Sequence, residues 1–289
     1  MSTDRLRVHK TYKLYIGGAF PRSESGRSFT IADSKGRFLA NAARASRKDV
    51  RDAVVAARGA QPGWAARTPY NRGQILYRVA EMLDGRHEQF TDELRAAGLA
   101  RNAARAEVDA AVDRWVWYAG WADKLAQVTG AANPVSGPFF NFSTPEPTGV
   151  VGVIAPDGPL LGLVSVLAPA IVTGNTAVLV AAENSPLPAV TLGEVLATSD
   201  LPGGVVNILT GHRTELAPWL ASHMDVNGLD LTGAPGELAV ECERAAADNL
   251  KRVLRPAETD PMADWTAAPG ITRMTTFLET KTVWHPVGG

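Results

Sequence analysis

The chain has 289 residues, of which 45% are hydrophobic, and its formal net charge at pH 7 is -1. This composition is typical of a globular protein that buries one large core or two smaller ones. The near-zero net charge gives no electrostatic reason to bind nucleic acid or an anionic membrane surface, so we expect neither as a partner. The longest apolar run, residues 149–155, is also far shorter than a membrane span.

The cysteine content points to an intracellular setting. Cys242 is the single cysteine, so an internal disulfide is excluded, and the segment after Met1 lacks the apolar core of a secretory signal. We therefore expect a cytoplasmic protein. Cys242 lies between Glu241 and Glu243 in a helical stretch. Because neighbouring negative charge opposes thiolate formation, we expect it to be a small buried helix residue and not a nucleophile.

The first part of the chain combines short β-type runs with helices. Three runs at 14–16, 28–31 and 38–40 are separated by glycine-containing turns, which predicts N-terminal hairpins over about residues 12–42. Ser46 is expected to cap the helix that follows, because apolar residues recur at helical spacing after it. The same spacing predicts further helices over 72–90 and 104–128.

The middle of the chain alternates between apolar strands and helices. The predicted strands are 150–154, 176–180 and 205–209, and the helices between and after them are 160–172, 186–197 and 214–222. This alternation predicts an α/β fold whose Rossmann-like sheet is parallel, with right-handed crossovers. Ligands are then expected beyond the carboxyl ends of the strands.

A family resemblance rests on motifs spread in order over roughly residues 12–254. The stretch 146–156 resembles the entry to the cofactor domain of NAD(P)-dependent aldehyde dehydrogenases. Further segments are similar to the same family and follow in the family's order: 15–18, 118–124, 168–170, 174–176, 183–187, 201–208 and 221–226. The resemblance implies a cofactor-type domain with an N-terminal segment of hairpins and helices.

Departures from the family pattern fall on its catalytic groups. An Asn amide that helps to stabilise the oxyanion in the family is missing, and the shorter turn 156–159 carries Asp157 instead. The family's general base would follow Val253, where this chain continues into Leu254 and Pro256. No cysteine stands in the nucleophile's place. We therefore expect no catalytic residue, and no metal site, because the histidines lack partners at metal-ligand spacing.

The resemblance also implies a reduced cofactor site. The family's Lys-Pro-Ala-Glu supplies Lys and Glu to the adenosine ribose, and here only Glu183 remains, with Val180 in place of the Lys. The family's Phe-Thr-Gly-Ser, at a helix N-terminus that faces the pyrophosphate, keeps Thr232 and Gly233 but has Ala234 in place of the Ser. We therefore expect vestigial cofactor contacts at Glu183, Thr232 and Gly233, with weak NAD(P) binding or none.

The end of the chain resembles a distant part of the family. Residues 270–284 are similar to the extreme C-terminal segment of a full member, including its oligomerisation strand. The segment that separates this match from the one before it is too short to form a domain. We therefore expect a cofactor-type domain over 1–260, a linker and oligomerisation tail over 261–289, and no catalytic domain.

These features favour a non-catalytic subunit that assembles with a full-length aldehyde dehydrogenase paralogue. The contact would be the strand Phe277 to Trp284, which would otherwise be an unpaired apolar strand. Deletion after Thr276 would then abolish the complex and leave the domain folded. Alternatives are a regulatory module that binds NAD(P), an active aldehyde oxidoreductase with atypical residues, and a tail that folds back on its own domain.

Overall fold

A five-stranded parallel sheet lies at the centre of the chain, in a computed structural model that describes residues 9–255 and 264–288. The strand order is β10-β9-β6-β7-β8. The bounds are β6 (Val150–Ile154), β7 (Thr176–Val180), β8 (Val206–Leu209), β9 (Gly228–Asp230) and β10 (Arg252–Leu254). The α/β class is confirmed, and the first two strands have the predicted bounds because their continuous apolar runs are buried on both faces.

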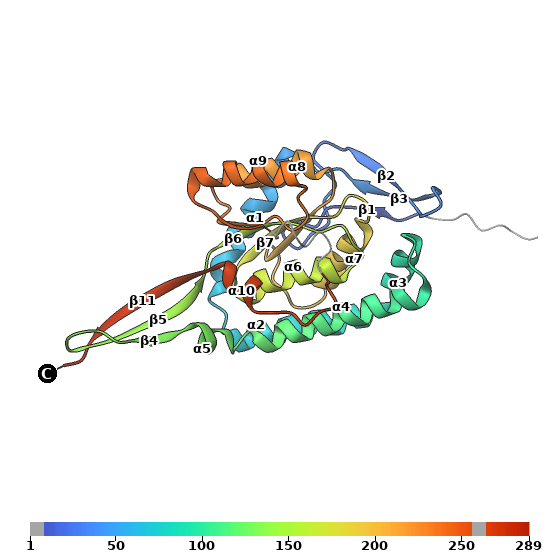
Figure 1. The fold of residues 1–289 in the computed structure, drawn as a ribbon. Helices are drawn as coiled ribbons and strands as arrows, with labels where there is room; N and C mark the ends of the chain where they lie inside the picture. The colour runs from blue at the N-terminus through green and yellow to red at the C-terminus, as the bar shows by residue number, and fades with distance from the viewer. Residues whose placement is uncertain (1–8, 256–263, 289) are drawn as a thin grey trace, which may run out of the picture.

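Helices cover both faces of this sheet (Figure 1). One face packs on α1 (Arg47–Ala65), α8 (Arg213–Ser222) and α9 (Gly236–Ala246), the last continuing into the 3-10 turn η1 (Ala247–Asn249). The other packs on α6 (Leu161–Val172) and α7 (Leu187–Leu196), with α2 (Pro69–Asp84), α3 (His87–Ala96) and α4 (Arg101–Trp121) outside them. Along β7, Val178 joins the first core and Leu179 the second. The alternation of a strand's side chains therefore divides the core into two layers.

The N-terminal residues form a small sheet of order β1-β3-β2. Its strands are β1 (Thr11–Tyr12), β2 (Ser28–Ala32) and β3 (Phe38–Ala43). The hairpin between β2 and β3 is confirmed, but β1 runs parallel to β3 and so forms no hairpin with it. The predicted strand at 14–16 is wrong, because Tyr15 instead forms an isolated bridge with Ile208 at the edge of the central sheet.

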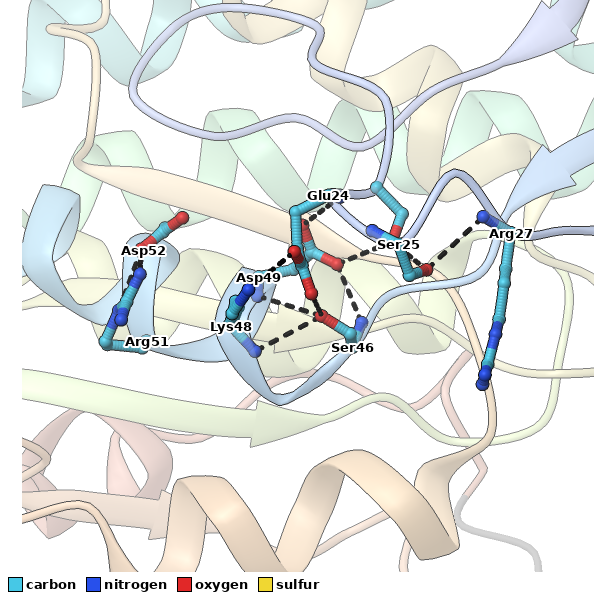
Figure 2. Close-up of polar contacts among 9 residues, drawn as sticks. Glu24, Ser25, Arg27, Ser46, Lys48, Asp49, Arg51 and Asp52 are labelled. Carbon is cyan, nitrogen blue, oxygen red and sulfur yellow. Dashed lines mark hydrogen bonds and ion pairs between the residues drawn. The ribbon is translucent and has the colours of Figure 1, made fainter.

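A polar cluster fixes the start of α1 (Figure 2). Ser46 is the N-cap, as predicted, and its hydroxyl accepts hydrogen bonds from the amides of Lys48 and Asp49. The Asp49 carboxylate accepts in return from the Ser46 amide (2.7 Å) and from the Ser23 hydroxyl (2.7 Å). This capping box satisfies amides that have no partner within the helix, and it attaches the preceding loop to α1.

Two helices that the sequence predicts as continuous are divided. The stretch 72–90 forms α2 and α3, because Gly85 is the C-cap of α2 and α3 begins only at His87. The stretch 104–128 forms α4 and the short α5 (Leu125–Thr129). Within the described ranges, no helix has both the length and the apolar character that crossing a bilayer requires.

A three-stranded antiparallel sheet projects from the body of the molecule as an arm (Figure 1). It consists of β4 (Ala131–Asn133), β5 (Phe139–Pro147) and β11 (Leu278–Pro286) in the order β11-β5-β4. The expectation of an unpaired tail is wrong, because β11 pairs with β5 of the same chain along its whole length. This pairing agrees with the alternative of a tail that folds back on its own domain, although no strand was predicted over 131–147.

The residues before β11 are part of the main core. Short helix α10 (Thr272–Thr276) contributes Met274, and Phe277 follows with 2% of its surface exposed. The Phe277 carbonyl accepts hydrogen bonds from the Asn175 side-chain amide (2.8 Å) and the Thr148 amide (3.2 Å). A deletion after Thr276 would therefore remove a core side chain, which makes it unsuitable as a test of the arm alone. The predicted boundary at 260 lies outside the described residues.

Candidate functional site

The candidate site lies at the carboxyl ends of the parallel strands. From β6 the chain continues to β7 and β8 on one side, and then returns to β9 and β10 on the other. Such a reversal of strand order is the place where open α/β sheets usually bind ligands. The residues that follow β6, β7, β8 and β9 therefore form the region to inspect.

Glu183 lies just beyond β7, as predicted, but its carboxylate is bound within the chain. It accepts the Arg213 backbone amide (2.7 Å) and contacts His212 Nδ1 (3.1 Å). Burial raises the pKa of Glu183, but the hydrogen bonds from His212 and Arg213 outweigh this effect and hold the pKa below its ordinary value. Glu183 is therefore an ionised carboxylate that already has partners.

Thr232 follows β9, and it too is engaged within the chain. Its hydroxyl donates to Asp230 and accepts from the Arg273 guanidinium (3.0 Å). Asp230 is buried at the end of β9 and also accepts from Arg273 (2.7 Å). Burial raises the pKa of Asp230, and Arg273 and Thr232 act against that rise. Thr232 is thus hydrogen-bonded to both members of the Asp230–Arg273 ion pair.

Gly233 makes the closest contact between the two halves of the sheet. Its amide donates to the Ile154 carbonyl (2.9 Å), so this amide is not free to bind a phosphate. A Cβ atom at this position would lie 1.8 Å from the Ala155 carbonyl oxygen, which only glycine avoids. The chain after β9 therefore rests directly on the chain after β6.

Arg213, which was not among the predicted site residues, connects these groups. Its guanidinium donates to the Gly233 carbonyl and to the Asp157 carboxylate, and its Nε lies 3.6 Å from Glu183 Oε1. One side chain at the start of α8 thus contacts residues that follow β6, β7 and β9. The available sequence signal was its place just after a predicted strand.

A carboxylate also occupies the N-terminus of α6. Glu107, on α4, accepts the backbone amides of Leu160 (3.1 Å) and Leu161 (2.7 Å). A helix N-terminus attracts anions, because its first amides have no partner within the helix. Here the anion is a side chain of the chain itself.

Cys242 lies on α9 with 0% of its surface exposed, as a buried helix residue. Burial, and then the charges of Glu241 and Glu243, raise the pKa of its thiol to about 12. A thiol in this state is a poor nucleophile at neutral pH. Among the residues that the structure describes, no group of three or more potential ligands could hold a metal ion.

A cavity of about 450 Å³ lies elsewhere, against the turn between β2 and β3 and the end of α3. Arg37 forms an ion pair with Asp33 and Arg95 with Asp92, and Lys35 also lines the cavity. Its lining residues are Asp33, Ser34, Lys35, Arg37, Phe38, Leu39, Arg95 and Ala96. The cavity therefore lies apart from the strand ends, and its lining contains none of the predicted site residues.

Comparison with known proteins identifies the family. The model of the "Aldehyde dehydrogenase family" matches residues 20–256. The chain belongs to the aldehyde dehydrogenase family. Aldehyde dehydrogenase family 2 member B4, mitochondrial, of Arabidopsis thaliana is 35% identical over 251 residues, which are 83% of this chain and 45% of that protein. Retinal dehydrogenase 2 of Homo sapiens is 32% identical over 258 residues, 87% of this chain and 49% of that protein.

Solved structures agree with this assignment. The crystal structure of HpcC from Thermus thermophilus has a TM-score of 0.80 at 33% identity, and the match covers 84% of this chain and 47% of that one. The NAD+ complex of aldehyde dehydrogenase from Bacillus cereus has a TM-score of 0.77 at 27% identity, with 84% and 50% covered. The chain thus has the Rossmann-like fold of the family, and it spans about half the length of the relatives it matches.

The residues at the strand ends do not fit a dinucleotide in this arrangement. Glu183 is bound by Arg213, the Thr232 hydroxyl is bound by Asp230 and Arg273, and the Gly233 amide is bound by Ile154. Each of the three residues predicted to contact a cofactor therefore already has a partner within the chain.

Proposed function

We propose that this chain is a non-catalytic aldehyde dehydrogenase-like subunit that assembles with a full-length aldehyde dehydrogenase. The observation that carries the proposal is the position of β11, a nine-residue strand at the outer edge of the projecting arm. In the described part of the chain, its other edge pairs with no strand. Backbone groups along a free edge can add a strand of another chain.

The arm's surface supports this role. Large apolar side chains are exposed on both of its faces, among them Phe140 (52%) on one face and Trp284 (57%) on the other. Each contacts another ring of the arm, Phe140 with Phe142 and Trp284 with Phe139, but more than half of its surface stays exposed. Exposed aromatic residues of this kind often anchor a protein interface. Lys281 forms an ion pair with Glu146 (2.9 Å) on the face that carries Phe140. The arm thus combines a free edge, an apolar surface and charge, as a partner-binding element requires.

The lack of a suitable nucleophile supports the non-catalytic part of the proposal. Cys242 is the sole cysteine of the sequence, and its thiol is buried and held protonated. Asp157, in the turn where the family has an amide donor, forms an ion pair with Arg213 and would repel an oxyanion. We further propose weak NAD(P) binding or none, a cytoplasmic location, and no nucleic-acid or membrane partner, in line with a net charge of -1.

The test is co-purification of the tagged chain with a full-length aldehyde dehydrogenase of the same host. Trp284→Ala should weaken the complex about 30-fold, as truncation of an interface anchor typically does. Trp219→Ala is the matched control, because Trp219 is also exposed but lies on α8, where it stacks with Arg47. Failure to capture a full-length enzyme, or equal affinity of the two variants, would refute the proposal.

A further inference from the structure

Arg213 lies where the sheet reverses its strand order, at the carboxyl ends of the strands. Its contacts indicate how the crevice between these strand ends is held together. We propose that Arg213 closes the crevice from within, so that an internal ion-pair network, and not a bound dinucleotide, holds the strand ends together. This inference goes beyond the proposed subunit role. Either one can fail without the other, because the arm and the strand ends are tested separately.

The geometry of the strand ends gives the first reason. A ligand at the reversal point would have to lie between the residues after β6 and those after β9. Gly233 already donates its amide to the Ile154 carbonyl (2.9 Å), and its Cα is packed against the Ala155 carbonyl. The Arg213 guanidinium then binds the Gly233 carbonyl and Asp157, on either side of this contact. The two halves of the crevice are therefore joined by direct hydrogen bonds.

The charges around Arg213 give a second reason. The side chain of Arg213 is 10% exposed, whereas those of Asp157 and Glu183 are 56% and 31% exposed. A pyrophosphate that approaches from solvent therefore meets two carboxylates before it reaches the guanidinium that could attract it. To bind, it would have to displace Arg213 from both, which leaves a buried guanidinium without its carboxylate partners. The charges thus favour the internal network over an external anion.

Other polar groups around the crevice are also bound within the chain. On the α6 side, Glu107 accepts the first amides of that helix. Arg273 binds Asp230 and Thr232 at the end of β9. The Trp265 ring lies close to α6, where a Cβ added at Gly162 would meet it at 3.0 Å. Closure by Arg213 is therefore one part of a consistent pattern around the crevice.

The main test measures the thermal midpoint of the full chain with and without NAD+ or NADP+ at about 1 mM, a concentration that reveals millimolar or tighter binding. The wild-type midpoint should not move. The double variant Asp157→Asn, Arg213→Gly should melt at least about 3 °C lower, and NAD+ should then raise its midpoint. A rise in the wild type, or an unresponsive double variant that is folded, would overturn the proposal.

Two further measurements keep the test decisive. Arg101→Gly is the matched control, because Arg101 is likewise the first residue of a helix but is exposed. Its midpoint should stay within about 1 °C of the wild type, without a response to NAD+. If the double variant does not fold, amide hydrogen exchange of the wild type decides. Protection of residues 182–184 and 231–234 should be the same with and without NAD+, and cofactor-dependent protection would overturn the proposal.

Discussion

Phe277 joins the arm to the body of the molecule, and its replacement by Ala tests whether the end of the chain belongs to the core. The ring lies against Gly228 on β9, where an added Cβ would be 2.7 Å from Phe277 Cδ1. The hydrogen bonds that reach Phe277 from Asn175 and Thr148 go to its backbone carbonyl, so the substitution leaves them in place. The variant therefore removes side-chain packing and little else.

The expected magnitude follows from burial. Phe277 is 2% exposed, and truncation of a buried Phe to Ala costs about 3–5 kcal/mol in lost burial and cavity formation. A domain of this size moves its melting midpoint by about 2–4 °C per kcal/mol, so we expect a fall of roughly 6–20 °C. Such a loss is a large part of a typical total stability of about 5–15 kcal/mol.

Urea and thermal unfolding followed by circular dichroism measure this change directly. Phe140→Ala is the control, because Phe140 is 52% exposed on the arm, and its loss should change the unfolding free energy by no more than about 0.5 kcal/mol. The same control variant should weaken association with a partner. If Phe277→Ala costs less than about 1 kcal/mol, or if both variants destabilise equally, Phe277 is not a core anchor.

Two other predictions concern single side chains. Cys242→Ser should not alter the turnover of any complex with a full-length enzyme. Native Cys242 should resist iodoacetamide at about pH 8 but react in urea, because burial and then Glu241 and Glu243 raise the pKa of its thiol to about 12. Rapid labelling of the native protein, detected by mass spectrometry, would contradict this. Burial raises the pKa of Glu93 above its ordinary value of 4.5, although the hydroxyls of Thr191 and Tyr12 donate hydrogen bonds to its carboxylate. The contribution of Glu93 to stability is therefore complete below pH 4.5 and is lost as the pH rises through its folded-state pKa. Glu93→Gln should therefore gain stability relative to wild type in urea unfolding as the pH rises above about 4.5, with Glu237→Gln, at an exposed position, as the control.

The central fold could be predicted because its signals are local. Continuous apolar runs gave the bounds of β6 and β7, and Ser46 marked the start of α1 through a side chain that caps its own helix. The arm could not be predicted in this way. β5 contains Pro145 and Pro147, which obscure a strand pattern, and its pairing with β11 depends on residues far away in the sequence.

The candidate site was predicted in position but not in contacts. Glu183 follows β7, a strand that the alternation predicted, whereas Thr232 and Gly233 follow β9, which was not predicted and was approached only through the resemblance. The resemblance alone gave no reason to expect that Arg213 binds in their midst. An arginine carries no periodic signal, and Arg213 is buried only because three strand ends meet around it. Such contacts depend on tertiary packing, which sequence patterns do not contain.

The pairing of β5 with β11 also sets an order of events during synthesis. Ser143 and Thr282, whose hydroxyls lie 3.1 Å apart across this pair, are separated by 139 residues. At translation rates of about 5–20 residues per second, β5 waits roughly 7–28 s before β11 is made. During this interval its edge is open to incorrect pairing, which the missing amides of Pro145 and Pro147 reduce. The arm is thus the last part of the described fold that the growing chain can complete.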